Sequence, residues 1–411
     1  MDPSELADHD ALNARRRRRG FAPLFANGDI NRLAAHTTVH SLAWGVAGTF
    51  WTVFLLRAGL RPAWILTAIA GILMLRFALR PLALWTLPIL GPRRTLILGT
   101  FLFALQYPAL AMVDRPGPAL AVCCFITALG GVFYWTCYHA FFAALGDVAH
   151  RGGQLGARQA FGALAGVLGP AAGGLLLARF GPWSAFGAAA ALEMAAAWPL
   201  LAVTELPFLR TAPPRAYAAA RTGAAIFFTD GWISGCTAIL WDVIAFRALD
   251  ARYAAFGALV AAAALAGAVG GVFWGRFIDA GHARRAVGVS AAIIIATLLF
   301  KAASGGDPLL VIAASISASL FAALYIPSLL TAFYNEAKAS PCTLRFHFAA
   351  EGGWDVGGAM GCLIAAGAAA LGAPLPLLLL IGIPGVIVQA RLLRRRYKAQ
   401  ALHLAPQMPL P

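Results

Sequence analysis

Long apolar runs, separated by short polar or basic segments, make up most of the chain. A helix that spans a lipid bilayer needs about 20 consecutive and mainly apolar residues. The runs that fit this length are 36–57, 62–83, 95–113, 118–145, 158–179, 182–204, 222–246, 253–275, 286–304, 309–334, 346–371 and 374–391. The pattern predicts an all-α integral membrane protein with about twelve transmembrane helices.

Composition supports this class and excludes others. The 411 residues are 60% hydrophobic and only 12% charged, with a mean hydropathy of +0.75, which is more apolar than a soluble domain requires. The net charge of +15 is spread over the connecting segments, so it does not indicate a nucleic-acid-binding face. All cysteines except Cys342 lie inside apolar runs, without CxxC spacing, so we expect no structural metal and no cofactor.

The basic segments predict the orientation. Short basic loops stay on the cytoplasmic side of a membrane. The N-terminal tail 1–35, the linker 205–222 and the C-terminal tail 394–411 are all basic. We therefore expect both termini in the cytoplasm and the protein in a bacterial inner membrane, with two bundles of helices over 36–204 and 223–393.

One charged segment lies between two of the long apolar runs, over residues 275–285. It contains Gly275, Asp279, Arg284 and Arg285. Asp279 can pair with an arginine and can stabilise the N-terminus of the next helix. Such a contact can hold two helices in one arrangement and release them in another.

This segment resembles the loop signature of the major facilitator superfamily. In that family the loop occurs once in each half of the chain, and here Gly91, Arg93 and Arg94 fit the first copy while Pro88 replaces its acidic residue. The resemblance implies two pseudo-symmetric six-helix bundles and a monomeric secondary transporter with gating loops. In such a transporter, substrate binds near the middle of the membrane and moves by alternating access.

A glycine-rich segment in the fifth run contains Gly169, Pro170, Gly173 and Gly174. It is similar to a motif of the antiporter branches of the superfamily, which implies export. Small residues at this spacing also let helices approach closely, so tight packing without a directional role is the alternative.

Three titratable residues form a stripe in the eleventh run. His347, Glu351 and Asp355 follow one another at intervals of four, which places them along one side of a helix. A charged carboxylate at the bilayer centre costs about 2.5–3.5 kcal/mol, so intramembrane acids are functional candidates. We predict binding of protons or substrate here. A static pair with Arg345, Arg76 or Arg80 is the alternative.

Further candidates lie in other runs. Asp230 and Trp241 share one face of the seventh run, and the resemblance places that helix beside the central cavity. His40, Tyr138 and His139 add polar and aromatic groups suited to an organic cation or a proton relay. Arg76 and Arg80 lie one turn apart near the end of the second run, where we expect them to extend to the membrane surface, with a cavity-facing position as the alternative.

These features predict a secondary transporter of a small organic solute, proton-coupled and with export favoured. A carrier of metal ions or other cations is a second hypothesis, because histidines and carboxylates suit several divalent metals. A lipid-handling or assembly protein, or a membrane enzyme, on the same fold is a third. The chain has no P-loop, HExxH motif or nucleophile elbow, so we do not expect an enzyme.

Overall fold

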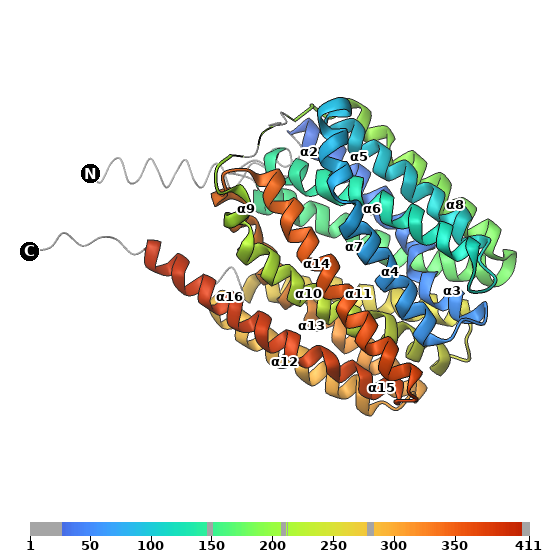
Figure 1. Ribbon diagram of the computed structural model, residues 1–411. Helices are drawn as coiled ribbons and strands as arrows, with labels where there is room; N and C mark the ends of the chain where they lie inside the picture. The colour runs from blue at the N-terminus through green and yellow to red at the C-terminus, as the bar shows by residue number, and fades with distance from the viewer. Residues whose placement is uncertain (1–26, 146–150, 207–210, 212, 278–282, 405–411) are drawn as a thin grey trace, which may run out of the picture.

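The chain folds into long helices that run side by side (Figure 1). A computed structural model describes residues 27–145, 151–206, 211, 213–277 and 283–404. Within these residues nine helical segments are long and apolar enough to cross a membrane. Together with the long helices α12, α13 and α14, these segments account for the twelve predicted spans.

The described helices form two groups. The first bundle contains α2 (Gly28–Val46), η2 (Gly48–Phe50), α3 (Trp51–Arg57), α4 (Pro62–Leu79), α5 (Pro81–Ala111), α6 (Pro118–Leu145), α7 (Arg151–Phe180), α8 (Pro182–Ala196) and η3 (Trp198–Ala202). The short helix α9 (Ala216–Ala219) follows. The second bundle contains α10 (Arg221–Ala248), α11 (Tyr253–Phe277), α12 (Ala283–Ala303), α13 (Pro308–Ala339), α14 (Thr343–Ala370), α15 (Leu375–Leu378), η5 (Leu379–Gly382) and α16 (Ile383–Leu404).

The two bundles repeat the same packing. In the first bundle α2 packs on α7 and α8, α4 packs on α6, and α5 packs on α6 and α8. In the second, α10 packs on α14 and α16, α11 packs on α13, and α12 packs on α13 and α16. Each contact has its equivalent six spans later, as expected for a pseudo-symmetric pair of bundles.

Several helix boundaries differ from the sequence prediction, and three of them show why. α2 begins at Gly28 instead of residue 36, because the Asn27 side chain accepts a hydrogen bond from the Ile30 N–H at 3.1 Å and caps the helix. Most of the predicted loop 84–94 is helical within α5, and the chain breaks only at Gly91, where φ is 78°. α16 continues to Leu404, past the predicted start of the tail.

The helix ends define two faces of the molecule. We call the face where α2 begins and α6 and α16 end the terminal face; the Asn27 side chain there donates to the Leu145 carbonyl at 3.1 Å. The face where α3 ends and α15 begins is the opposite face. In Figure 1 the end of α16 and α9 lie at the left, while α3 and α15 lie at the right.

Candidate functional site

The strongest polar contact between the bundles joins α4 to α14. The Asp355 carboxylate, on α14, forms ion pairs with the guanidinium groups of Arg76, on α4, and of Arg80, which directly follows α4. The Asp355 side chain is fully buried and the two arginine side chains are 10% and 3% exposed. Gly131 leaves room for this arrangement, since a Cβ there would collide with the Arg76 side chain.

This contact corrects one expectation. We expected Arg76 and Arg80 to extend to the membrane surface, and that expectation is wrong, because both are buried in the interface between the bundles. The stable pair that was the alternative for Asp355 is the arrangement in the structure. Arg345, the other candidate partner, donates instead to the Tyr217 hydroxyl at 2.9 Å.

A second contact between the bundles lies one turn along α14. Glu351 Oε1 is 3.5 Å from Nε2 of His139, on α6. The His139 ring stacks on His347 with 5.5 Å between ring centroids. The stripe His347, Glu351 and Asp355 is therefore buried against the first bundle. We name Arg76, Arg80, His139, Glu351 and Asp355 the interbundle ion cluster.

The charges of this cluster balance. Two guanidinium groups face two carboxyl groups, so the cluster is neutral when both acids are ionised and His139 is uncharged. One added proton, on Glu351 or His139, gives it a charge of +1. Because low-dielectric surroundings strengthen interactions between charges, one proton can alter the attraction between the bundles.

A further acid lies within the second bundle. Asp230, half-buried on α10, accepts hydrogen bonds from the Tyr325 hydroxyl at 2.6 Å and from the Trp354 indole at 3.1 Å. The Tyr325 oxygen also lies 2.6 Å from the Gln389 amide oxygen. A hydroxyl has one proton, so a turned Gln389 amide, donating to Tyr325, satisfies all three groups. In the described part of the chain, every hydrogen-bond partner of Asp230 is thus uncharged.

Trp354 connects the two acidic sites. Its indole N–H donates to Asp230, while its ring lies 5.1 Å from the Arg76 guanidinium carbon. Sequence reasoning missed Trp354 and Gln389. Trp354 directly precedes Asp355 in the acidic stripe, and this position is the signal that could have identified it.

Of the predicted histidines, His40 is buried inside the first bundle. His40 Nδ1 is 2.7 Å from Oε1 of Glu193 on α8, so it pairs within the bundle. Its neighbour His36 has Nδ1 at 2.8 Å from the Ala196 carbonyl and Nε2 at 3.1 Å from the Tyr134 hydroxyl. Nδ1 of His36 must therefore carry a proton and donate, whereas Nε2 faces a hydroxyl that can either donate or accept.

The other two predicted aromatic residues have separate surroundings. Tyr138 is buried, stacks on Tyr134 at 5.5 Å and accepts a hydrogen bond from the Thr37 hydroxyl at 3.2 Å. Trp241 lies in the second bundle, where its indole donates to Ser315 Oγ at 3.1 Å. The Tyr138 ring also meets the His139 ring edge-on, with 5.5 Å between the centroids, so Tyr138 borders the interbundle ion cluster.

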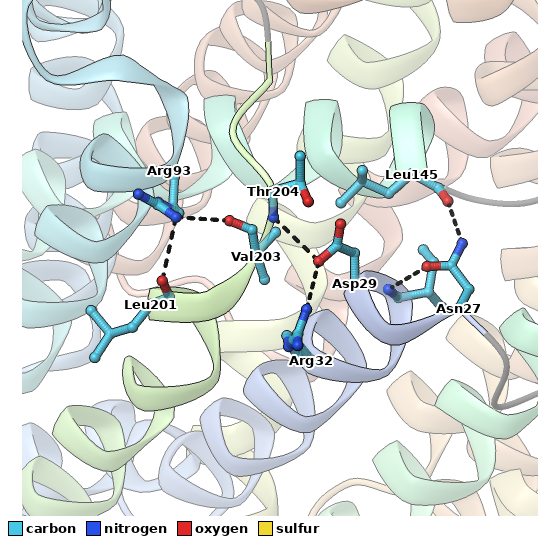
Figure 2. A network of polar contacts seen from close by, with 9 residues as sticks. Asn27, Asp29, Arg32, Arg93, Leu145, Leu201, Val203 and Thr204 are labelled. Atoms are coloured by element: carbon cyan, nitrogen blue, oxygen red, sulfur yellow. Dashed lines mark hydrogen bonds and ion pairs between the residues drawn. The ribbon is translucent and has the colours of Figure 1, made fainter.

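The first predicted gating loop is built around Gly91. A Cβ at this positive-φ position would press on the Glu205 carboxylate. Glu205 accepts a hydrogen bond from the Arg93 backbone N–H at 2.8 Å, and Arg93 donates to the Leu201 and Val203 carbonyls, as Figure 2 shows. Glu205 thus supplies the acid that Pro88 does not, while Arg94 is exposed.

Only part of the second predicted loop can be located. Gly275 lies in the last turns of α11, and Arg284 and Arg285 lie in the first turn of α12. Asp279 lies outside the described residues.

The glycine motif of α7 lies at two close helix contacts. Gly169 packs on Gly45 of α2, and a Cβ at Gly173 would overlap the Val46 backbone. A Cβ at Gly174 would instead collide with the Tyr253 carbonyl of α11, in the other bundle. The Pro170 carbonyl lies against Gly257 of the same helix. One face of α7 therefore packs within its bundle and another between the bundles.

Across the described residues, no group of three or more His, Cys, Asp or Glu side chains is arranged to hold a metal ion. The acids and histidines described above have arginine, tyrosine, tryptophan or one another as partners instead. The site is a set of ionic and hydrogen-bonded pairs.

Two six-helix bundles joined by buried charges define a helical membrane-carrier fold. No protein-family model matches the sequence, and no curated protein matches it. Solved structures match closely in fold at low identity. E. coli fucose:proton symporter FucP gives a TM-score of 0.62 at 14% identity, covering 89% of this chain and 98% of that chain.

Two further solved structures agree. The POT family transporter PepTSo gives a TM-score of 0.66 at 12% identity, covering 92% of this chain and 99% of that one. The human organic anion transporter MFSD10 (TETRAN) gives 0.64 at 16% identity, covering 89% and 99%. The chain therefore has the fold of the major facilitator superfamily, as its sequence predicts. All these neighbours are transporters, in agreement with the expectation that the chain is not an enzyme.

Proposed function

We propose that this protein is a secondary active transporter that moves a small organic solute across a membrane by alternating access. The observation that carries the proposal is the interbundle ion cluster, in which five titratable side chains from two bundles meet in the membrane interior. Ion pairs that bridge two rigid bodies are suited to form in one conformation and separate in another.

Proton coupling is part of the proposal. Glu351 and His139 are the groups whose protonation would unbalance the cluster, and Asp230 is a second proton or substrate site because its described partners are neutral. Asp355 has a different role, since it forms ion pairs with two arginines of the other bundle. Its part is to keep α4 and α14 together.

The sequence supports the proposed orientation, oligomeric state and direction of transport. The basic segments favour cytoplasmic termini in a bacterial inner membrane, and the fold resemblance favours a monomer. The glycine motif of α7 favours export by antiport. The named neighbours include a fucose:proton symporter, so the test must distinguish the two directions.

The test uses proteoliposomes that contain a pH-sensitive dye. Organic cations, organic anions, amino acids and sugars are added outside one at a time. A substrate entering by antiport drives protons out and makes the interior alkaline, whereas symport makes it acidic, whatever the orientation of the protein. We expect alkalinisation by one compound class, and its loss in Glu351→Gln and Asp230→Asn.

The control is Asp114→Asn, because the Asp114 side chain is 78% exposed in a connecting segment. It should transport as wild type does. Substrate flux without any pH change would contradict proton coupling. Full coupling in both membrane variants would contradict these site assignments.

A further inference from the structure

The second bundle contains a cavity that is separate from the interbundle ion cluster. It has a volume of about 260 Å³ and is bounded by α10, α11, α12 and α13. Phe256, Leu259, Val260 and Ala263 form an apolar wall along α11. Asp242 and Lys301 bring opposite charges to the same cavity, from α10 and α12.

These two charges do not pair directly. With the residues that the structure describes, the Asp242 carboxylate and the Lys301 ammonium form no hydrogen bond and no ion pair within 4.0 Å. Charged side chains inside a membrane normally pair with one another or face a functional cavity. An acid and a base that border one cavity without touching leave room for a ligand between them.

The surroundings of Lys301 hold it in place. Its ammonium lies 4.5 Å from the centroid of the Trp241 ring, which is a cation–π contact. The Trp241 indole donates to Ser315 Oγ at 3.1 Å, and the Ser315 hydroxyl donates to the Val311 carbonyl at 2.8 Å. Because this chain fixes the ring, it also fixes the position of the positive charge, and preorganised groups bind at lower entropic cost.

The volume of the cavity limits the size of the ligand. Sites for drug-sized molecules have volumes of about 300–1,000 Å³. A water molecule occupies about 30 Å³ in the liquid, so this cavity has room for roughly nine non-hydrogen atoms. That is the size of a free amino acid with a branched aliphatic side chain.

We propose that this cavity binds a small zwitterion with an apolar body, of the amino-acid type. Asp242 accepts hydrogen bonds from its ammonium group, Lys301 donates to its carboxylate, and the α11 wall contacts its side chain. Amino-acid-type zwitterions are then also the transported substrates. This assignment of the substrate rests on the proposed transport function.

Binding to the purified full-length protein tests the site without requiring transport. The probes are leucine, 3-methylbutylamine, which lacks the carboxylate, and 4-methylpentanoate, which lacks the ammonium. We expect leucine to bind roughly 30-fold more tightly than either analogue, because each analogue leaves one half-buried charge of the cavity without a partner. Equal affinity for the three probes, or no leucine binding by folded wild type, would overturn the proposal.

Variants assign each charge to its partner. In Asp242→Asn the preference for leucine over 4-methylpentanoate should disappear, and in Lys301→Met the preference over 3-methylbutylamine should disappear. Asp250→Asn is the matched control, because Asp250 is 81% exposed beyond the end of α10. Thermal unfolding of each variant confirms its folding, and unchanged preferences in folded variants would overturn the assignment.

Leucine flux in proteoliposomes separates this inference from the proposed function. Selective binding without flux of any solute would uphold the site and contradict the transporter. Flux of a solute that both cavity variants leave unchanged, with no selective leucine binding, would uphold the transporter and overturn this site.

Discussion

The two bundles meet in chemically different ways at the two ends of their interface. Towards the opposite face one apolar cluster continues across both bundles, with Phe50 5.8 Å from Phe256 and 6.3 Å from Tyr253. Towards the terminal face, the buried apolar residues form clusters within each bundle, and Leu344 of α14 packs against the cluster of the first bundle. There the interbundle ion cluster joins α14 to α4 and α6.

The difference has a physical consequence. Apolar packing is insensitive to protonation, whereas the attraction across the ion cluster depends on its charge balance. Arg57 adds one polar contact at the opposite face, where it donates to the Ala251 carbonyl at 2.5 Å. In this conformation the apolar contacts towards the opposite face do not depend on a proton, whereas the contacts of the ion cluster, towards the terminal face, do.

The largest effect should follow from removing the shared carboxylate. Asp355→Ala leaves two buried guanidinium groups without their acid, which costs about 3–5 kcal/mol in comparable buried pairs. We expect a lower unfolding temperature in detergent and no transport. A double variant with Asp355→Ala and Arg80→Met should recover much of the stability, because one guanidinium group, of Arg76, then again balances one carboxylate, of Glu351.

If Asp355→Ala unfolds at the wild-type temperature, the ion cluster does not hold the bundles together. The exposed-site variant Asp114→Asn again serves as the control for loss of a carboxylate alone.

A smaller effect should follow from weakening the apolar end. Phe50→Ala removes contacts with Phe256 and Tyr253. In lipid an apolar side chain gains little free energy by moving from the solvent into the protein, so the cost of the substitution comes mainly from the cavity that it leaves. We expect a loss of about 2 kcal/mol that is the same at pH 5.5 and pH 8. Unfolding measured at both pH values checks this, and a strong pH dependence would break the contrast between the two ends.

Close helix contact at the same end gives a third prediction. In Gly174→Ala the new methyl group would press on the Tyr253 carbonyl, so we expect a loss of about 1–2 kcal/mol from overpacking between α7 and α11. Gly162→Ala on the same helix is the matched control, because its Cβ position is open. The control should be neutral or slightly stabilising, and equal losses in both variants would contradict the contact.

The smallest effect belongs to an ion pair within one bundle. Arg93 and Glu205 are 3.7 Å apart and partly exposed, at 29% and 41%. Exposed pairs contribute about 0–1 kcal/mol, so Glu205→Gln, which leaves the hydrogen bonds of the Arg93 side chain in place, should change the free energy of unfolding by less than 1 kcal/mol. A loss as large as that of Asp355→Ala would show that exposure does not separate the two kinds of ion pair.

The sequence was sufficient for the fold class, because twelve apolar runs leave few alternatives in a membrane. The positions of the charges were harder to predict. Arg76 and Arg80 lie near a helix end, where long side chains usually extend to the surface, and only the approach of α14 from 275 residues away explains their burial. The partner of Glu193 was likewise unpredictable, since His40 is 153 residues distant.

Sequence patterns predicted positions more reliably where all the residues of the pattern lie on one helix. The spacing of His347, Glu351 and Asp355 places them on one buried stripe, as its periodicity indicates. The boundary of α2 depended on a cap at Asn27 that precedes the apolar run, and hydropathy alone does not detect such a cap.

The central claim is that the charge balance of the ion cluster controls separation of the bundles at the terminal face only. Paired spin labels test it directly. One pair, Arg94→Cys with Arg395→Cys, reports on the terminal face, and Asp114→Cys with Leu371→Cys reports on the opposite face. All four positions are exposed, and Cys342→Ser removes the cysteine that is not buried.

Distances are measured by pulsed electron resonance in wild type and in Glu351→Gln. We predict that the variant shifts the terminal-face pair to longer distances and leaves the opposite-face pair unchanged. A shift of the opposite-face pair alone, or no shift of either, would contradict the account.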